Sequence, residues 1–208
     1  MMQDVYKAPE AELIGPQNMT DASEFFVVSI RKLWIMNLLT IGSYGLVWHY
    51  QHWKQFRDSI SDRDIWPVPR AIFTIFFVHA LFGLIQDSSQ QKGGSPWNAN
   101  LLATLYILVA IFSSVLGYLP IDSFLSTPDA AAILYVVNLV LAVLANTYFL
   151  TKAQAHANFA CDDVEGIANS KITWLNIIWI TVFGLYLLAM LIGIFLGSSI
   201  LLGALLDA

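Results

Sequence analysis

The sequence predicts an all-α, polytopic transmembrane bundle of four or five spans, and three observations support this fold class. Hydrophobic residues make up 57% of the 208 residues, and the mean hydropathy is +0.64. Charged residues make up only 12%, whereas soluble domains carry about 25%. The charges also stand in short clusters and leave long uncharged runs. A soluble core in so short a chain could not bury these runs, whereas a lipid bilayer accommodates them.

Residues 1–24 form a polar N-terminal tail with two prolines and no apolar stretch, so no cleavable signal peptide is expected. Residues 25–206 are predicted to form a single membrane-embedded helical domain. Its apolar segments cover about residues 25–50, 71–86, 101–119, 130–150 and 172–206.

The first segment carries a signal for a break in its middle. Arg31 and Lys32 interrupt it and leave 18 residues, Leu33–Tyr50, without a full charge. A helix of this length is about 27 Å long, which is just enough to cross a bilayer core. The residues from Thr40 to Gly45 include two glycines and a serine, a composition that favours a kink or a turn. Gly42 and Gly45 are therefore predicted to be hinge residues.

The distribution of lysine and arginine favours a first segment that turns back. If all five segments cross the membrane, the two sides collect six and four of these cations. If the first segment is re-entrant or sharply kinked, the count becomes seven against three, with Lys92, Lys152 and Lys171 on the poorer side. The positive-inside rule favours the second arrangement. The tail and residues 51–70 are then predicted to be cytoplasmic.

The second segment, 71–86, follows a Trp66–Pro69 run whose prolines suit the first turn of a helix. With 16 residues it is short for a span, so it is expected to recruit flanking residues. A loop rich in serine, glycine and glutamine is predicted over 87–99. The third segment follows this loop and ends at Pro120.

The fourth segment, 130–150, follows a helix-start signal in which Thr127 is the N-cap and Pro128 is the first helical residue. Its 21 residues are long enough for a span. Residues 151–171 are polar and are predicted to be a link. The last segment has 35 apolar residues and is about 52 Å long if wholly helical. We expect one span over about Trp174–Ile194, followed by an apolar extension.

A motif in the first segment resembles a known family. The pattern T-x-G-x-Y-x-x-x-W-x-Y-x-x-W is made by Thr40, Gly42, Tyr44, Trp48, Tyr50 and Trp53. Residues 25–60 thereby resemble small bacterial membrane proteins grouped as a domain of unknown function. Residues 4–9 are similar to an N-P-Y-x-A-P opening of small bacterial inner-membrane proteins, with Asp4-Val5 in place of Asn-Pro. The resemblance implies a location in the bacterial inner membrane and transfers no catalytic residues.

Three histidines are weak candidates for metal ligands. His49 and His52 are three residues apart and share a face of a helix, and His79 lies within the second segment. Such imidazoles bind zinc or another transition metal where further ligands converge. In the alternative interpretation His49 and His52 lie at the membrane interface, and His79 makes a buried hydrogen bond. The acidic residues 162–166 lack the spacing of an EF-hand and are expected to form a solvated turn.

Asn138 and Asn146 are polar positions within the fourth segment. They are eight residues apart and lie on roughly one face of a helix. With His79 they could line a path for a solute, or they could hydrogen-bond neighbouring helices. No segment carries an acid, a lysine or an arginine at its centre, which argues against an ion-coupled or proton-coupled transporter.

The last segment carries a small residue at every fourth position, namely Ala189, Gly193 and Gly197. This spacing lets two helices approach closely, either in two copies of the chain or within one chain. The net charge of −5 argues against nucleic acid as a partner, and the single cysteine excludes an internal disulfide and a cysteine-cluster metal site.

The sequence contains no catalytic motif, and no cofactor is expected. The prediction is a non-enzymatic inner-membrane protein that acts through helix–helix assembly, as a homo-oligomer or as an accessory subunit. Its partners are then the lipid bilayer and a second copy or another membrane protein. The alternative is a small-solute transporter or channel.

Overall fold

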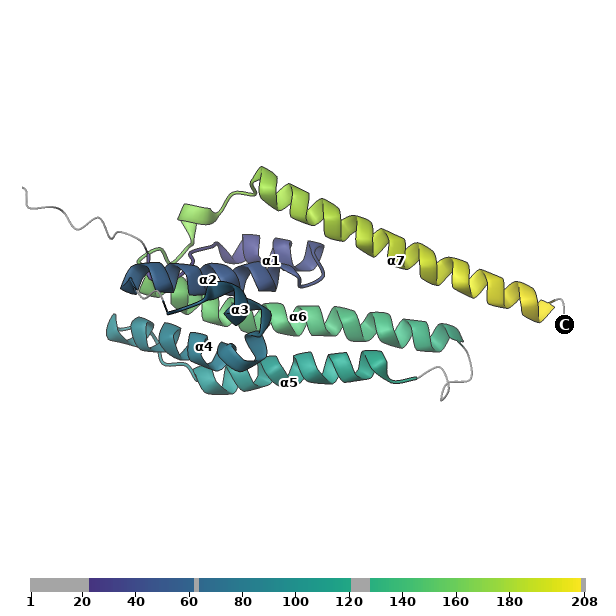
Figure 1. The fold of residues 1–208 in the computed structure, drawn as a ribbon, viewed down its shortest axis with the longest axis horizontal. Helices are drawn as coiled ribbons and strands as arrows, with labels where there is room; N and C mark the ends of the chain where they lie inside the picture. Colours follow the sequence, from purple (N-terminus) through teal and green to yellow (C-terminus); the bar gives the residue numbers. More distant parts are fainter. Residues whose placement is uncertain (1–22, 62–63, 121–127, 207–208) are drawn as a thin grey trace, which may run out of the picture.

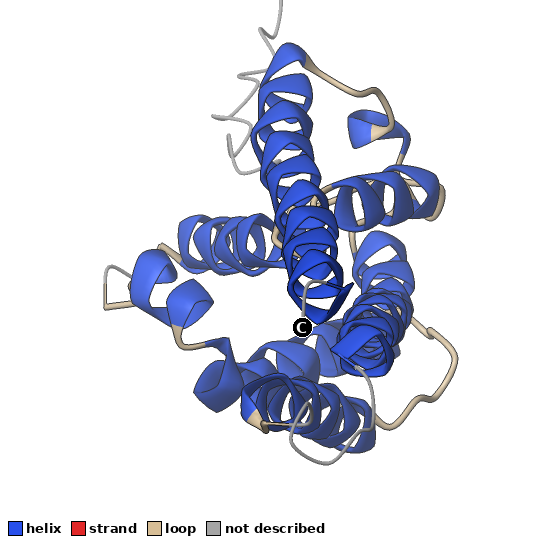
Figure 2. Ribbon diagram, turned by 90° about the vertical axis from the view of Figure 1, so that its right-hand side faces the viewer, coloured by secondary structure: helices blue, strands red, loops and turns tan. Residues whose placement is uncertain are grey.

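The computed structural model describes residues 23–61, 64–120 and 128–206, which form helices and loops without a strand among them (Figures 1 and 2). The all-helical class predicted from the sequence is therefore correct. Most of the N-terminal tail, and Thr127 with its predicted capping role, lie outside the described residues. In chain order the helices are α1 (Ile30–Leu39), α2 (Tyr44–Ile60), α3 (Pro67–Ile72), α4 (Thr74–Gln91), α5 (Ala99–Tyr118), α6 (Pro128–Ala160), the short 3₁₀ helix η2 (Ile167–Asn169) and α7 (Trp174–Leu206).

Among the described residues, α5 and α6 are long and apolar enough to cross a membrane. Their most apolar windows have mean hydropathies of 2.1 and 2.0, and only 11% and 17% of these windows are buried. The core helix of a soluble protein would be mostly buried. Apolar helices that expose most of their surface are instead typical of contact with lipid. The described apolar part of α7, Trp174–Met190, is shorter, so the structure establishes two candidate spans rather than four or five.

The first apolar segment is not one continuous helix. α1 ends at Leu39, and α2 begins at Tyr44 after a turn in which Ile41 has φ 53° and Gly42 has φ 80°. The Thr40 hydroxyl donates to the Met36 carbonyl at 2.6 Å and accepts from the Tyr44 amide at 3.1 Å. The turn is therefore held by local hydrogen bonds, and α2 runs back in the opposite direction to α1 (Figure 1).

Two other predicted boundaries differ from the structure. Residues 71–86 fall in α3 and α4, which are separated at Phe73, and α4 continues to Gln91. Residues 151–160, predicted to begin a link, continue α6 to Ala160. The prediction failed there because the polar side chains of this stretch, Gln154 and Asn158, are buried against the rest of the protein rather than solvated.

The main core lies at the end of the molecule where α2, α4 and α6 meet the extended residues that precede α1. Its fully buried side chains include Phe25, Val28, Leu33, Met36, Trp48, Trp53, Leu81, Phe82, Ile85 and Ala153. Trp48 and Trp53 of the family-like motif are therefore core residues. The opposite halves of α5, α6 and α7 extend beyond this core (Figure 1).

The described lysines and arginines lie at one end of the fold, with the exception of Arg70 on α3. They are Arg31, Lys32, Lys54, Arg57, Arg70, Lys92, Lys152 and Lys171. They occupy the start of α1, the later part of α2, α3, the end of α4, the last turns of α6 and the link to α7. Figure 1 places these ends together, and the short α3 lies nearer the middle.

The positive-inside count made from the sequence assigned three of these cations to the wrong side. It placed Lys92, Lys152 and Lys171 opposite the cations of the first segment. The Lys32 ammonium instead donates to the carbonyl oxygen of Lys171 at 2.7 Å. Lys92 forms an ion pair with Asp162, directly after α6. The count failed because it assumed that residues 71–86 cross the membrane, whereas α4 ends on the same side as α2 (Figure 1).

Candidate functional site

The three histidines that the sequence singles out lie in different surroundings. His49 and His52 are 1% and 0% exposed, so both are buried in the core of the protein. The Nδ1 atom of His49 lies 2.7 Å from the Gly45 carbonyl oxygen. On α4, His79 Nε2 lies 3.1 Å from the Thr104 hydroxyl of α5. Within the described ranges, no three histidine, cysteine or acidic side chains are grouped so as to hold a metal ion.

Gln154 of α6 is the centre of a buried polar network. Its side-chain oxygen accepts from the indole N–H of Trp48 and lies 3.2 Å from Nε2 of His52. Its side-chain nitrogen donates to the Phe26 carbonyl at 2.8 Å. One amide thus joins α2, α6 and the extended segment that precedes α1.

Asn158, one helical turn later, supports the same extended segment. Its side-chain oxygen accepts from the Val28 amide at 3.3 Å, and its side-chain nitrogen donates to the Val28 carbonyl at 3.0 Å. This pair of bonds is the pattern that a neighbouring β-strand would supply. Residues 23–29 have no strand partner among the described residues, so side-chain amides satisfy their buried backbone groups instead.

The turn after α6 contacts the other side of residues 23–29. Asn169 donates from its side chain to the Val27 carbonyl at 3.2 Å. Gly166 has φ 67°, and a Cβ atom there would overlap the backbone of Val28. Asp163 fixes the turn by accepting from the amides of Ile167 and Ala168 at 2.9 Å. These two bonds hold the pKa of Asp163 below its ordinary value of 3.8.

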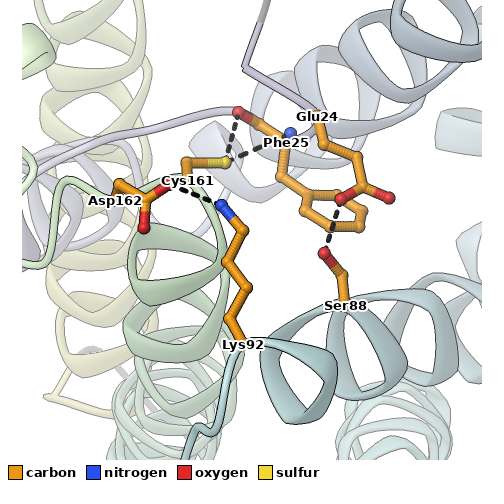
Figure 3. A network of polar contacts seen from close by, with 6 residues as sticks. All are labelled: Glu24, Phe25, Ser88, Lys92, Cys161 and Asp162. Atoms are coloured by element: carbon orange, nitrogen blue, oxygen red, sulfur yellow. Dashed lines mark hydrogen bonds and ion pairs between the residues drawn. The ribbon is translucent and has the colours of Figure 1, made fainter.

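Figure 3 shows how the start of the extended segment is joined to α4 and to the end of α6. The Ser88 hydroxyl donates to the Glu24 carboxylate, and the Phe25 amide donates to the sulfur of Cys161 at 3.4 Å. Lys92 pairs with Asp162 beside them. Burial raises the pKa of the partly buried Cys161 thiol above its ordinary value of 9.0.

The two asparagines in the apolar part of α6, Asn138 and Asn146, have different surroundings. Asn138 donates from its side chain to the Ser113 carbonyl at 3.1 Å and thereby joins α6 to α5. Asn146 has a buried side-chain oxygen without a hydrogen-bond partner in the protein. It lies with Gly42, Gly45 and Asn37 around the turn between α1 and α2. The sequence alone assigns no role to Asn37, because nothing local indicates what the turn faces.

The predicted helix-packing residues lie on an uncovered face of α7. Ala189 and Gly193 are exposed, and no described atom lies within 4 Å of a Cβ placed on Gly193. The side-chain surroundings of Gly197 lie outside the described part of the chain. α7 packs chiefly against α1 and α6, and it extends past the ends of α5 and α6 (Figure 1). Its exposed apolar residues include Leu175, Ile177, Ile178, Val182, Leu185, Leu188 and Ile192.

Comparison with protein-family models, with curated proteins and with solved structures finds no match for this chain.

Proposed function

We propose that this chain is a polytopic membrane protein that acts through helix–helix assembly, with α7 as the assembling helix. The observation that carries the proposal is the face of α7 that holds Ala189 and Gly193. It is exposed, and no described atom of the same chain contacts Gly193. In lipid, helices associate through close van der Waals packing, which small residues permit. The partner we propose is α7 of a second copy.

The proposed topology has three crossing helices and two hairpins. α5, α6 and α7 cross the bilayer, while α1–α2 and α3–α4 enter it and return to the cation-rich end. Two observations support this topology. The surfaces of α5 and α6 are apolar and exposed, and the chain reverses its direction in the turn at Gly42. The chain then has three crossing helices and two hairpins, fewer crossings than the four or five spans predicted from the sequence.

The cation-rich end is proposed to face the cytoplasm, since positively charged loops are retained there. The N-terminal tail is then cytoplasmic, because residues 23–29 dock at this end against α6. The bacterial inner membrane is proposed from the resemblance of residues 25–60 alone.

Native mass spectrometry of the protein released from mild detergent tests the assembly. We expect the wild-type chain to form an oligomer and Gly193→Ile to shift it to the monomer, because the larger side chain separates the helices. Gly184→Ile is the matched control. Gly184 also has no atom within 4 Å of its Cβ position, and at about 100° per residue it lies on the opposite face of α7.

Gly184→Ile should therefore remain oligomeric. A wild-type monomer without a partner would contradict the proposal, and so would an equal loss of oligomer in both variants.

A further inference from the structure

A polar pocket of about 240 Å³ lies where the turn between α1 and α2 meets α5 and α6. Side chains from three parts of the chain that are distant in sequence contribute to it. Its polar lining residues are Asn37, Tyr106, Ser113, Ser114, Asn146 and Thr147. α5 and α6 are the two candidate spans, so this pocket lies between helices that otherwise present apolar surface.

Two amide side chains of this lining each have one buried atom that makes no hydrogen bond to the described residues. Asn37 is 1% exposed, and its side-chain nitrogen makes no hydrogen bond. The side-chain oxygen of Asn146 is also buried and accepts none. Most buried polar atoms are hydrogen-bonded, because leaving one without a partner costs free energy. One unused donor and one unused acceptor therefore line the same pocket.

Two hydroxyl groups of the lining are hydrogen-bonded within their own helices. Thr147 donates to the Val143 carbonyl at 2.7 Å, and Ser114 donates to the Ala110 carbonyl at 2.8 Å. Their hydroxyl oxygens keep lone pairs that can accept a further bond. The amides of Asn37 and Asn146, together with these acceptors, therefore offer hydrogen bonds to a molecule in the pocket.

The pocket contains no charged lining residue, and part of its wall is apolar, including Leu139, Val143 and Leu150. An ion would lose its hydration here without gaining a counter-charge. The volume lies below the range of about 300–1,000 Å³ that is usual for drug-sized ligands. These features select a small, uncharged molecule that has a polar end and a short apolar part.

We propose that this pocket is a binding site for a small uncharged molecule that carries both a hydrogen-bond donor and an acceptor, such as a short-chain amide or alcohol. Its acceptor receives the N–H of Asn37, and its donor binds the side-chain oxygen of Asn146. Its apolar part packs against Leu139 and Val143. The site is separate from the exposed face of α7, so neither proposal depends on the other.

Saturation-transfer NMR on the intact protein in detergent tests this site with isobutyramide as the probe. Isobutyrate is the matched probe, because it has nearly the same shape and carries a negative charge. We expect saturation transfer to isobutyramide and not to isobutyrate. Asn37→Leu should weaken isobutyramide binding by about tenfold or more, since the N–H donor is lost. Asn100→Leu, at an exposed position of α5, should bind as the wild type does.

Thermal unfolding of the same variants separates binding from folding. Asn37 makes no side-chain hydrogen bond within the protein, so Asn37→Leu should keep the wild-type unfolding midpoint or raise it. Ser114→Leu is a second variant that fills the pocket from an exposed position, and it should also abolish binding. The proposal is overturned if the wild type shows no saturation transfer to isobutyramide, which is the result expected if the pocket holds only water. Equal signals from both probes, or wild-type binding by both pocket variants, would overturn it as well.

Discussion

At the scale of single residues, two amide side chains replace a missing backbone partner. Residues 23–29 are partly buried, and no strand among the described residues supplies hydrogen bonds to their backbone groups. Gln154 and Asn158 provide these bonds from successive turns of α6. An amide suits this role because it carries a donor and an acceptor on one side chain.

Gln154→Leu should lower the stability of the folded state. The change leaves the Trp48 indole N–H and the Phe26 carbonyl without their partner, and each such buried group costs about 1–3 kcal/mol. We expect a total loss of roughly 2–4 kcal/mol in the free energy of unfolding. Denaturant unfolding in detergent micelles measures it, with the exposed Gln90→Leu as the control. Equal midpoints for the two variants would show that the network contributes nothing.

At the scale of elements, the sequence predicts helices well where composition alone decides. The helices α5 and α7 start and end close to their predicted limits. Their boundaries can be predicted because polar residues or proline bound the uncharged stretches on either side. The end of α6 was not predicted, because Gln154 and Asn158 are polar and their stretch was therefore assigned to a solvated link. Their burial is explained by their hydrogen bonds to residues 23–29, which the sequence does not indicate.

The polar pocket also could not be predicted from the sequence. Asn37 and Asn146 are 109 residues apart, and no local pattern indicates that a turn would bring them together. Of the two glycines predicted to be hinge residues, Gly42 lies in the turn with a φ of 80°, which few other residues tolerate, and Gly45 lies within α2. What the turn packs against depends on the tertiary arrangement of α5 and α6.

The contact between the turn after α6 and residues 23–29 depends on a glycine. Gly166→Ala should destabilise the fold by roughly 2 kcal/mol or more, because φ 67° disfavours a side chain and the new Cβ overlaps the Val28 backbone. Gly83→Ala is the control within α4, where a Cβ meets no atom within 4 Å. There alanine should raise stability by about 0.5–1 kcal/mol through its helix propensity.

Thermal unfolding of both glycine variants in the same detergent compares these effects. Opposite shifts of the midpoint are expected. A neutral Gly166→Ala would mean that the turn does not pack closely on residues 23–29.

At the scale of the whole molecule, the charges and the apolar surface divide the fold into two regions. The core, Gln154, Asn158 and nearly all described cations lie where α2, α4 and α6 end (Figure 1), whereas the far halves of α5 and α6 and the described side chains of α7 are largely apolar and exposed. Such a division suits a protein whose cation-rich end faces water and whose apolar helices lie in the membrane. Assembly through α7 would then take place within the membrane region.

The central claim is that α5, α6 and α7 cross the membrane while both hairpins return to one side. Cysteine labelling tests it in a Cys161→Ser background with one new cysteine per variant. The positions are Ser95 between α4 and α5, Ser170 before α7, and Tyr118 at the far end of α5. All three residues are exposed, Tyr118 by 90%.

In intact bacterial cells, a membrane-impermeant maleimide should label Tyr118→Cys and leave Ser95→Cys and Ser170→Cys unlabelled until the membrane is permeabilised. This result would place the cation-rich end in the cytoplasm and the far end of α5 outside. Labelling of Ser95→Cys and Ser170→Cys from opposite sides, or of Tyr118→Cys from the same side as both, would contradict the proposed topology.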